Sequence, residues 1–196
     1  MNDRQNKCNA KQALAWWREL KGLSAEGDKT GKGDPGALAR LRRAATPVEA
    51  LTEGRAVELA ILLGVAPQDH ERLKRIGALA HVLAHVKDHR DGRMAEMLGP
   101  DDKGENAAMS TLRFQRLLAA RTPAELMSRM RGAVRLLDGS ANILDLAEAF
   151  CWWGDNIRIR WTYAYWGASH AAPPATPAAS SSGPAQDAAG RLPETN

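Results

Sequence analysis

The chain has 196 residues, which suits one domain or two small ones. Its formal charge of +4 fits a nucleic-acid binder but is shared by many other proteins, so the distribution of charge is more informative than the total. No run approaches the roughly 20 apolar residues of a membrane span, and the polar N-terminus is not a secretory signal. Two distant cysteines, Cys8 and Cys151, indicate neither a disulfide framework nor a zinc site, so we expect a cytoplasmic protein.

The first half of the chain has the apolar spacing of helices. Helical patterns cover residues 10–20, 36–45, 53–63 and 70–86. A further helix start is predicted at Thr46-Pro47-Val48-Glu49, because threonine caps, proline suits the first helical position and glutamate completes a capping box. Residues 22–36 hold five glycines and one proline and are expected to form a flexible loop.

The second half repeats this helix-start chemistry. Thr122 and Glu125 have the spacing of a capping box, which predicts a helix beginning at Pro123. Asn142 is expected to cap the helix that follows. Residues 157–166, IRIRWTYAYW, alternate as a strand does but also carry apolar residues at helical spacing. Helix is favoured there, because no partner strand is visible elsewhere.

The most informative segment is 110–137, which carries six arginines and a single carboxylate. A solvent-exposed helix face made almost only of arginine needs an anionic partner, because otherwise its charges repel one another. The planar guanidinium also matches phosphate, to which it donates two parallel hydrogen bonds. The alternative is a set of solvated arginines whose stems cover apolar surface.

No catalytic or metal site is indicated. His81, His85 and His89 recur at i, i+4 and i+8, but neither an HExxH pattern nor a third ligand accompanies them. No Ser/His/Asp or Cys/His arrangement stands out either. We therefore expect no enzymatic activity, no metal and no cofactor.

Two other features are interpreted as ordinary. The segment 27–33, GDKTGKG, misses the P-loop pattern because three residues separate its first two glycines and glycine replaces the Ser or Thr. Its lysines, Lys29 and Lys32, could still contact a nucleic acid. Most of the aromatic residues lie in apolar helices and are expected in the core rather than stacked on bases.

The order of motifs resembles a known family. An early Trp-containing helix is followed by LRRA at 41–44, LRFQRLL at 112–118 and an Arg-x-x-x-Arg-Leu-Leu element at 131–137. The chain then carries WWG at 152–154 and WTYAYW at 161–166. In combination these motifs resemble the CasB family, the small subunit of the type I-E CRISPR surveillance complex called Cascade. The resemblance covers residues 13–166 and is strongest from Ser110 onward.

This resemblance implies an all-α fold of two small helical bundles. We assign them to residues 10–90 and 107–166, with a linker at 91–106 and a disordered Ala/Pro/Ser-rich tail at 167–196. It implies a non-catalytic subunit in antiviral defence. Two copies would stack head to tail beside the Cascade backbone subunits, the large subunit and the guide RNA. No contact with a membrane is expected.

The resemblance also implies a role for the basic surface, which would hold the displaced non-target DNA strand, beside the target strand, and stabilise the R-loop. Sequence reading would belong to the guide RNA. By fit to the motifs, the candidate nucleic-acid-binding residues are Arg42, Arg43, Arg113, Arg116, Arg121, Arg129, Arg131 and Arg135.

Two alternatives remain open from the sequence. The first is a stand-alone helix-turn-helix regulator, which would need base-reading side chains at the start of a recognition helix. The helix after Thr122 begins Pro-Ala-Glu-Leu and is poor in such groups. The second is a purely structural scaffold whose arginines bind acidic protein surfaces.

Overall fold

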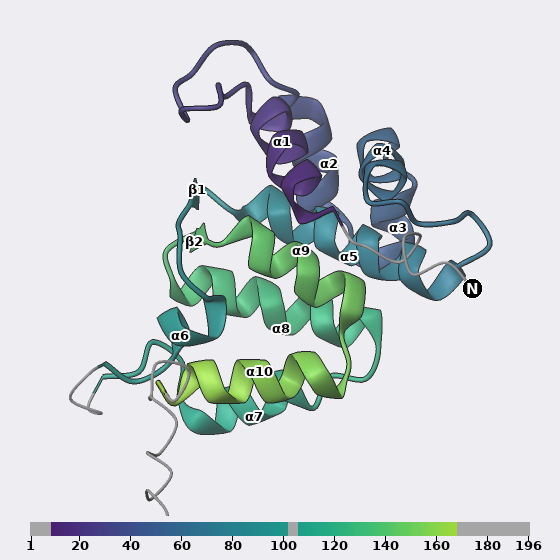
Figure 1. Cartoon of the computed structure of the whole chain (residues 1–196). Helices are drawn as coiled ribbons and strands as arrows, with labels where there is room; N and C mark the ends of the chain where they lie inside the picture. Colours follow the sequence, from purple (N-terminus) through teal and green to yellow (C-terminus); the bar gives the residue numbers. More distant parts are fainter. Residues whose placement is uncertain (1–8, 102–105, 168–196) are drawn as a thin grey trace, which may run out of the picture.

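The structure, a computed structural model, describes residues 9–101 and 106–167. These residues form ten helices and one two-stranded parallel sheet, which confirms the all-helical prediction (Figure 1). The helices are α1 Ala10–Lys21, α2 Pro35–Arg43, α3 Pro47–Leu51, α4 Gly54–Leu62, α5 His70–His85, α6 Met94–Leu98, α7 Thr111–Leu118, α8 Pro123–Leu136, α9 Ile143–Trp152 and α10 Asp155–Tyr165. The strands are β1 Asp88–His89 and β2 Ser140–Ala141.

The predicted helix starts are present. The Thr122 hydroxyl accepts a hydrogen bond from the backbone N–H of Glu125, and the Glu125 carboxylate accepts one from the N–H of Thr122, which completes the capping box of α8. The Asn142 side chain accepts hydrogen bonds from the first turn of α9. Thr46 caps α3 in the same way through the N–H of Glu49. The ambiguous segment after residue 154 forms the helix α10, as predicted.

Helix α5 lies at the centre of the molecule. It packs against α2, α3 and α4 of the first half and against α8 and α9 of the second half (Figure 1). Every residue from Ile76 to Ala84 is buried. Because α5 contacts both halves, the buried apolar side chains of the described residues form one continuous cluster.

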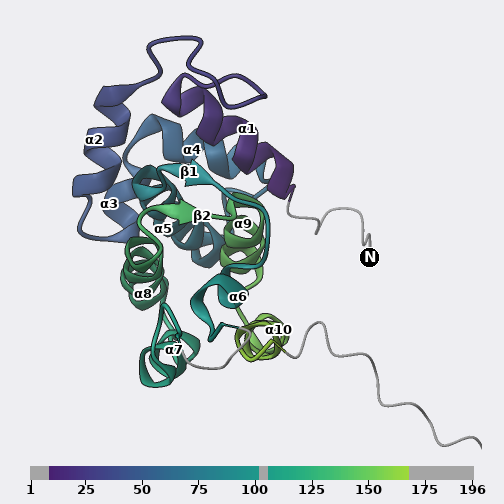
Figure 2. The ribbon, with the colours of Figure 1, turned by 90° about the vertical axis from the view of Figure 1, so that its left-hand side faces the viewer.

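The second half stacks in two layers on α5. Figure 2 views these helices nearly end-on, with α8 and α9 next to α5 and with α7 and α10 on the far side. The rings of Phe114 and Tyr165 stack at 4.0 Å between α7 and α10. The Tyr165 hydroxyl donates to the carbonyl of Met109 at 2.7 Å. These contacts fix α7 in position, which matters because α7 carries two of the candidate arginines.

The structure differs from the predicted linker at 91–106. Within that segment α6 buries Met94, Ala95 and Leu98, and the backbone N–H of Met94 donates to the Asp145 carboxylate at 2.8 Å. Just before it, β1 pairs in parallel with β2, a pairing that the sequence analysis did not predict. Three apolar side chains of this segment belong to the core, although most of its residues are polar.

The loop between α1 and α2, for which flexibility is predicted, is closed by backbone hydrogen bonds, with Leu23 bridged to Lys29.

Three further predictions concern the cysteines, the tail and the membrane. Cys151 is buried, and Cys8 lies outside the described residues. The tail predicted at 167–196 lies outside them too, except for Gly167. None of the helices in the described ranges has the length and apolar character needed to cross a membrane.

Candidate nucleic-acid interface

Helices α7 and α8 turn their arginines outward because their apolar residues turn inward. In α7, Phe114 and Leu117 are buried, which leaves Arg113 and Arg116 exposed. In α8 the buried residues are Leu126, Met127, Met130, Ala133 and Val134. The exposed arginines of α8 are Arg129, Arg131 and Arg135. The amphipathic pattern of the two helices therefore determines the basic surface.

Two hollows flank the outer face of α8. The first, which we call the α7–α8 hollow, has a volume of about 280 Å3 and includes Arg113, Arg116 and Arg129 in its lining. The second, the α5–α8 hollow, has a volume of about 640 Å3 and includes His85, Lys87 and Arg131. Both hollows are lined by Ser128, Gly132 and Arg135, so the two adjoin along α8.

Ion pairing distinguishes these arginines from others in the chain. Arg40 pairs with Glu53, Arg55 with Glu19, Asp34 and Glu58, Arg72 with Asp69, Arg158 with Asp155, and Arg160 with Asp145 and Glu148. Within the described residues, the five arginines of the two hollows form no ion pair. Their positive charge is therefore available to an anion from outside the chain.

The structure brings five of the eight predicted residues together and leaves three apart. Arg113, Arg116, Arg129, Arg131 and Arg135 line the two hollows. Arg121 lies in the turn between α7 and α8, and Arg43 lies exposed at the end of α2. Arg42 is also on α2, where its Nε donates to the carbonyl of Ala84 at 2.7 Å and ties α2 to the end of α5.

Lys87 is a site residue that is not among those predicted from the sequence. Its backbone N–H donates to the carbonyl of Gly139 at 2.8 Å, beside the paired strands β1 and β2. This long-range pairing brings Lys87 to the rim of the α5–α8 hollow. Nothing in the local sequence around Lys87 signals that position apart from its charge.

His85, the histidine that lines this hollow, adds no positive charge near neutral pH. Burial, followed by the nearby charges of His81, Arg131 and Arg42, lowers the pKa of His85 to about 4. His81 is fully buried, and its Nδ1 lies 2.8 Å from the carbonyl of Leu41. In the described part of the chain no group of three potential metal ligands is found.

Aromatic side chains take no part in either hollow. Among the tryptophans and tyrosines of the described ranges, only Tyr163 and Trp166 are exposed, at 60% and 56%, and both belong to the α10 end of the molecule. Most of the others are buried, as predicted. Stacking of bases is thus not supported at α8, whereas contact with phosphates is.

The described residues thus define a helical protein with a basic face, whose arginines at the two hollows form no ion pair among those residues. Residues 37–166 match the family described as CRISPR-associated protein Cse2, and the chain belongs to this family. No curated protein matches the sequence.

Solved structures share the fold. A CRISPR-associated protein of the Cse2 family from Thermus thermophilus is 24% identical, with a TM-score of 0.60, over 82% of this chain and 99% of that one. CasB from Thermus thermophilus is 23% identical, with a TM-score of 0.56, over the same shares. A chain of E. coli Cascade, solved bound to a PAM-containing double-stranded DNA target, is 19% identical with a TM-score of 0.57. That match covers 81% of this chain and 95% of the E. coli chain.

Proposed function

We propose that this chain is a non-catalytic subunit of a CRISPR Cascade complex that holds the displaced, non-target DNA strand by its phosphates and so stabilises the R-loop. One observation carries the proposal: the arginines of α7 and α8 line two adjoining hollows and lack carboxylate partners in the described residues. Membership of the Cse2 family and the fold shared with a chain of DNA-bound Cascade support it.

The chemistry of the hollows favours backbone contact without sequence reading. Arginine binds phosphate oxygens with two parallel hydrogen bonds and binds every nucleotide alike. With no tryptophan, tyrosine or phenylalanine in either lining, neither hollow provides a stacking platform. Sequence recognition then falls to base pairing with the guide RNA, while this surface contributes a sequence-independent and salt-sensitive term.

The partner surfaces of the proposed assembly are two exposed apolar helix faces. Helix α4 exposes Val57 and Ile61, and α10 exposes Ile159, Tyr163 and Trp166. These helices lie at opposite ends of the described molecule (Figure 1). A head-to-tail contact between two copies needs two different faces, which these helices supply. We propose that they meet the second copy and the neighbouring Cascade subunits.

The test measures R-loop lifetime on a matched target with the assembled complex. One preparation contains the unaltered subunit, one lacks it, and one carries Arg113→Glu with Arg116→Glu. The double reversal is expected to shorten the lifetime about tenfold while the subunit stays assembled, because two phosphate contacts become repulsions. The control, Lys11→Glu with Lys32→Glu, makes the same charge change at exposed residues outside both hollows.

The outcomes separate the proposal from the scaffold alternative. A lifetime that falls with the arginine reversal and not with the control supports phosphate binding at α7. If omission of the subunit collapses the R-loop while the arginine reversal leaves it unchanged, the chain acts as a scaffold and the assignment of these arginines is wrong.

A further inference from the structure

A third hollow lies on the first half of the molecule, between the end of α1, strand β1 and the loop that joins α1 to α2. Its volume is about 460 Å3, and its lining includes four cationic and two acidic side chains. The cations are Arg18, Lys21, Lys29 and Lys87, and the acids are Glu26 and Asp88. None of these cations forms an ion pair with a described residue. We call this third hollow the loop hollow.

The loop holds Lys29 in a defined place. Beside the bridge between Leu23 and Lys29, the Ser24 hydroxyl accepts hydrogen bonds from the N–H groups of Glu26 and Asp28. At the base, the backbones at Gly22 and Gly33 approach so closely that a Cβ on Gly22 would lie 2.6 Å from the nitrogen of Gly33. These contacts hold the backbone around Lys29 beside the end of α1.

Lys21 places its charge beside the backbone of Lys87. The Lys21 ammonium donates to the carbonyl of Lys87 at 3.3 Å and lies 5.3 Å from the centre of the Trp17 ring. Burial, then the charges of Arg42 and Lys87 against that of Asp88, lowers the pKa of Lys21. The charges of Arg42 and Lys87 disfavour the charged form of Lys21, and an anion from outside the chain would offset that repulsion.

Lys87 joins this hollow to the site described above, because it lines both the loop hollow and the α5–α8 hollow. We propose that the loop hollow binds the phosphodiester backbone of the same single DNA strand, so that the strand continues from α8 past Lys87 and beneath Lys29. This inference rests on the proposed function and lengthens its binding path.

The expected contact is with phosphates rather than bases. Trp17, the only tryptophan in the lining, is 2% exposed and offers no free face for stacking. The cations come from α1, the loop and the segment before β1, so they are distributed around the hollow as an extended polyanion requires.

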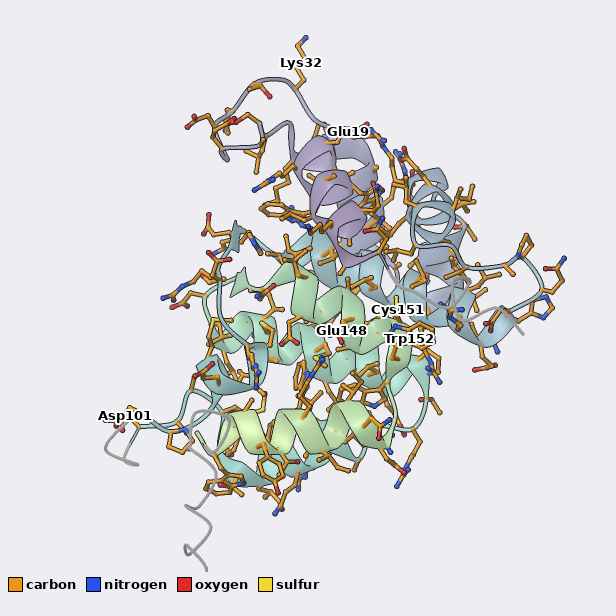
Figure 3. The ribbon with its side chains drawn as sticks, viewed as in Figure 1. Glu19, Lys32, Asp101, Glu148, Cys151 and Trp152 are labelled. Atoms are coloured by element: carbon orange, nitrogen blue, oxygen red, sulfur yellow. The ribbon has the colours of Figure 1, made fainter. Side chains whose placement is uncertain are left out.

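The loop supplies a matched pair of variants. Lys29→Glu reverses a charge inside the hollow. Lys32→Glu makes the same change on the same loop, but Lys32 does not line the hollow and its side chain projects away from the body of the molecule (Figure 3). Both residues are exposed, so neither substitution is expected to unfold the chain.

The measurement is the rate at which a single-strand nuclease digests the displaced strand in R-loops formed by the assembled complex. At matched salt we expect Lys29→Glu to raise the rate about fivefold and Lys32→Glu to leave it near the unaltered value. Lys29→Gln is expected to fall between them, because it removes the contact without adding repulsion. The Arg113→Glu with Arg116→Glu preparation is measured alongside.

Equal rates for Lys29→Glu and Lys32→Glu would overturn the inference. If the arginine reversal still speeds digestion in that case, the proposed function stands and only the path under the loop is wrong. If Lys29→Glu speeds digestion and the arginine reversal does not, the loop hollow binds the strand and the assignment to α7 fails.

Discussion

His85 is held neutral among cations, and this has a consequence for stability. Burial and the charges of His81, Arg131 and Arg42 lower its pKa to about 4, against about 6.5 in an unfolded chain. Between these values the unfolded chain takes up a proton that the folded chain does not, so stability falls as pH drops from 6.5 towards 4. We expect a loss of about 1–3 kcal/mol across this window.

The measurement is the free energy of unfolding by urea at pH 7 and at pH 5, for the unaltered chain and for His85→Gln. The variant should show a smaller difference between the two pH values. His70→Gln, which alters an exposed histidine at the start of the same helix, is the control and should keep the full difference. An identical pH dependence in all three proteins would contradict the burial argument.

At the residue scale, the sequence shows where arginines are concentrated, but it does not show which of them lack an ion-pair partner. Arg55 pairs with Glu19 and Arg40 with Glu53, partners that are 36 and 13 residues away. No local pattern indicates such pairing. The arginines of α7 and α8 were predictable because that stretch contains one carboxylate, and Glu125 serves the capping box. Lys87 and Lys21 were not predictable as site residues, because contacts between segments far apart in the sequence bring them to the hollows.

At the scale of elements, the packing of α5 on α3 depends on a glycine. A Cβ on Gly77 would lie 2.2 Å from the carbonyl oxygen of Pro47 and 2.7 Å from Cγ of Leu51. Gly77→Ala should therefore destabilise the protein by about 1–3 kcal/mol, since the backbone of Pro47 and the side chain of Leu51 both have to move. The loss is measured as the difference in the free energy of unfolding by denaturant between the variant and the unaltered chain.

The matched control for that prediction is Gly132→Ala, at the interior of α8. A Cβ there meets nothing within 4 Å, so alanine should be neutral or stabilise by up to about 1 kcal/mol through helix propensity. Equal stabilities of the two variants would show that α3 and α5 adapt without strain.

Most helices were predictable from their own residues, because apolar spacing and caps are local signals. The starts of α3, α8 and α9 were correct for this reason. Helix α6 was not, since five residues give too short a pattern to stand out in a polar stretch. The parallel pairing of β1 with β2 was missed as well, because two-residue strands carry no alternation.

At the scale of the whole molecule, α5 contacts elements from both halves of the chain and is buried between them. Removing either half would expose the apolar residues from Ile76 to Ala84. We therefore expect urea to unfold the described residues in one cooperative transition, with helix content and tryptophan fluorescence changing together. Two separate transitions would instead show that the halves are independent domains joined by a weak interface.

Such coupling bears on the proposed binding path, because the path crosses from α8 to the loop between α1 and α2. A strand bound at both ends gains affinity only if the hollows keep a fixed relation to one another. Hydrogen exchange of the α1 and α8 amides distinguishes the cases: similar opening free energies are expected for one rigid body. If α1 opens far more readily than α8, the loop hollow is not held in register with the arginines, and the fivefold effect of Lys29→Glu should shrink towards the value for Lys32→Glu.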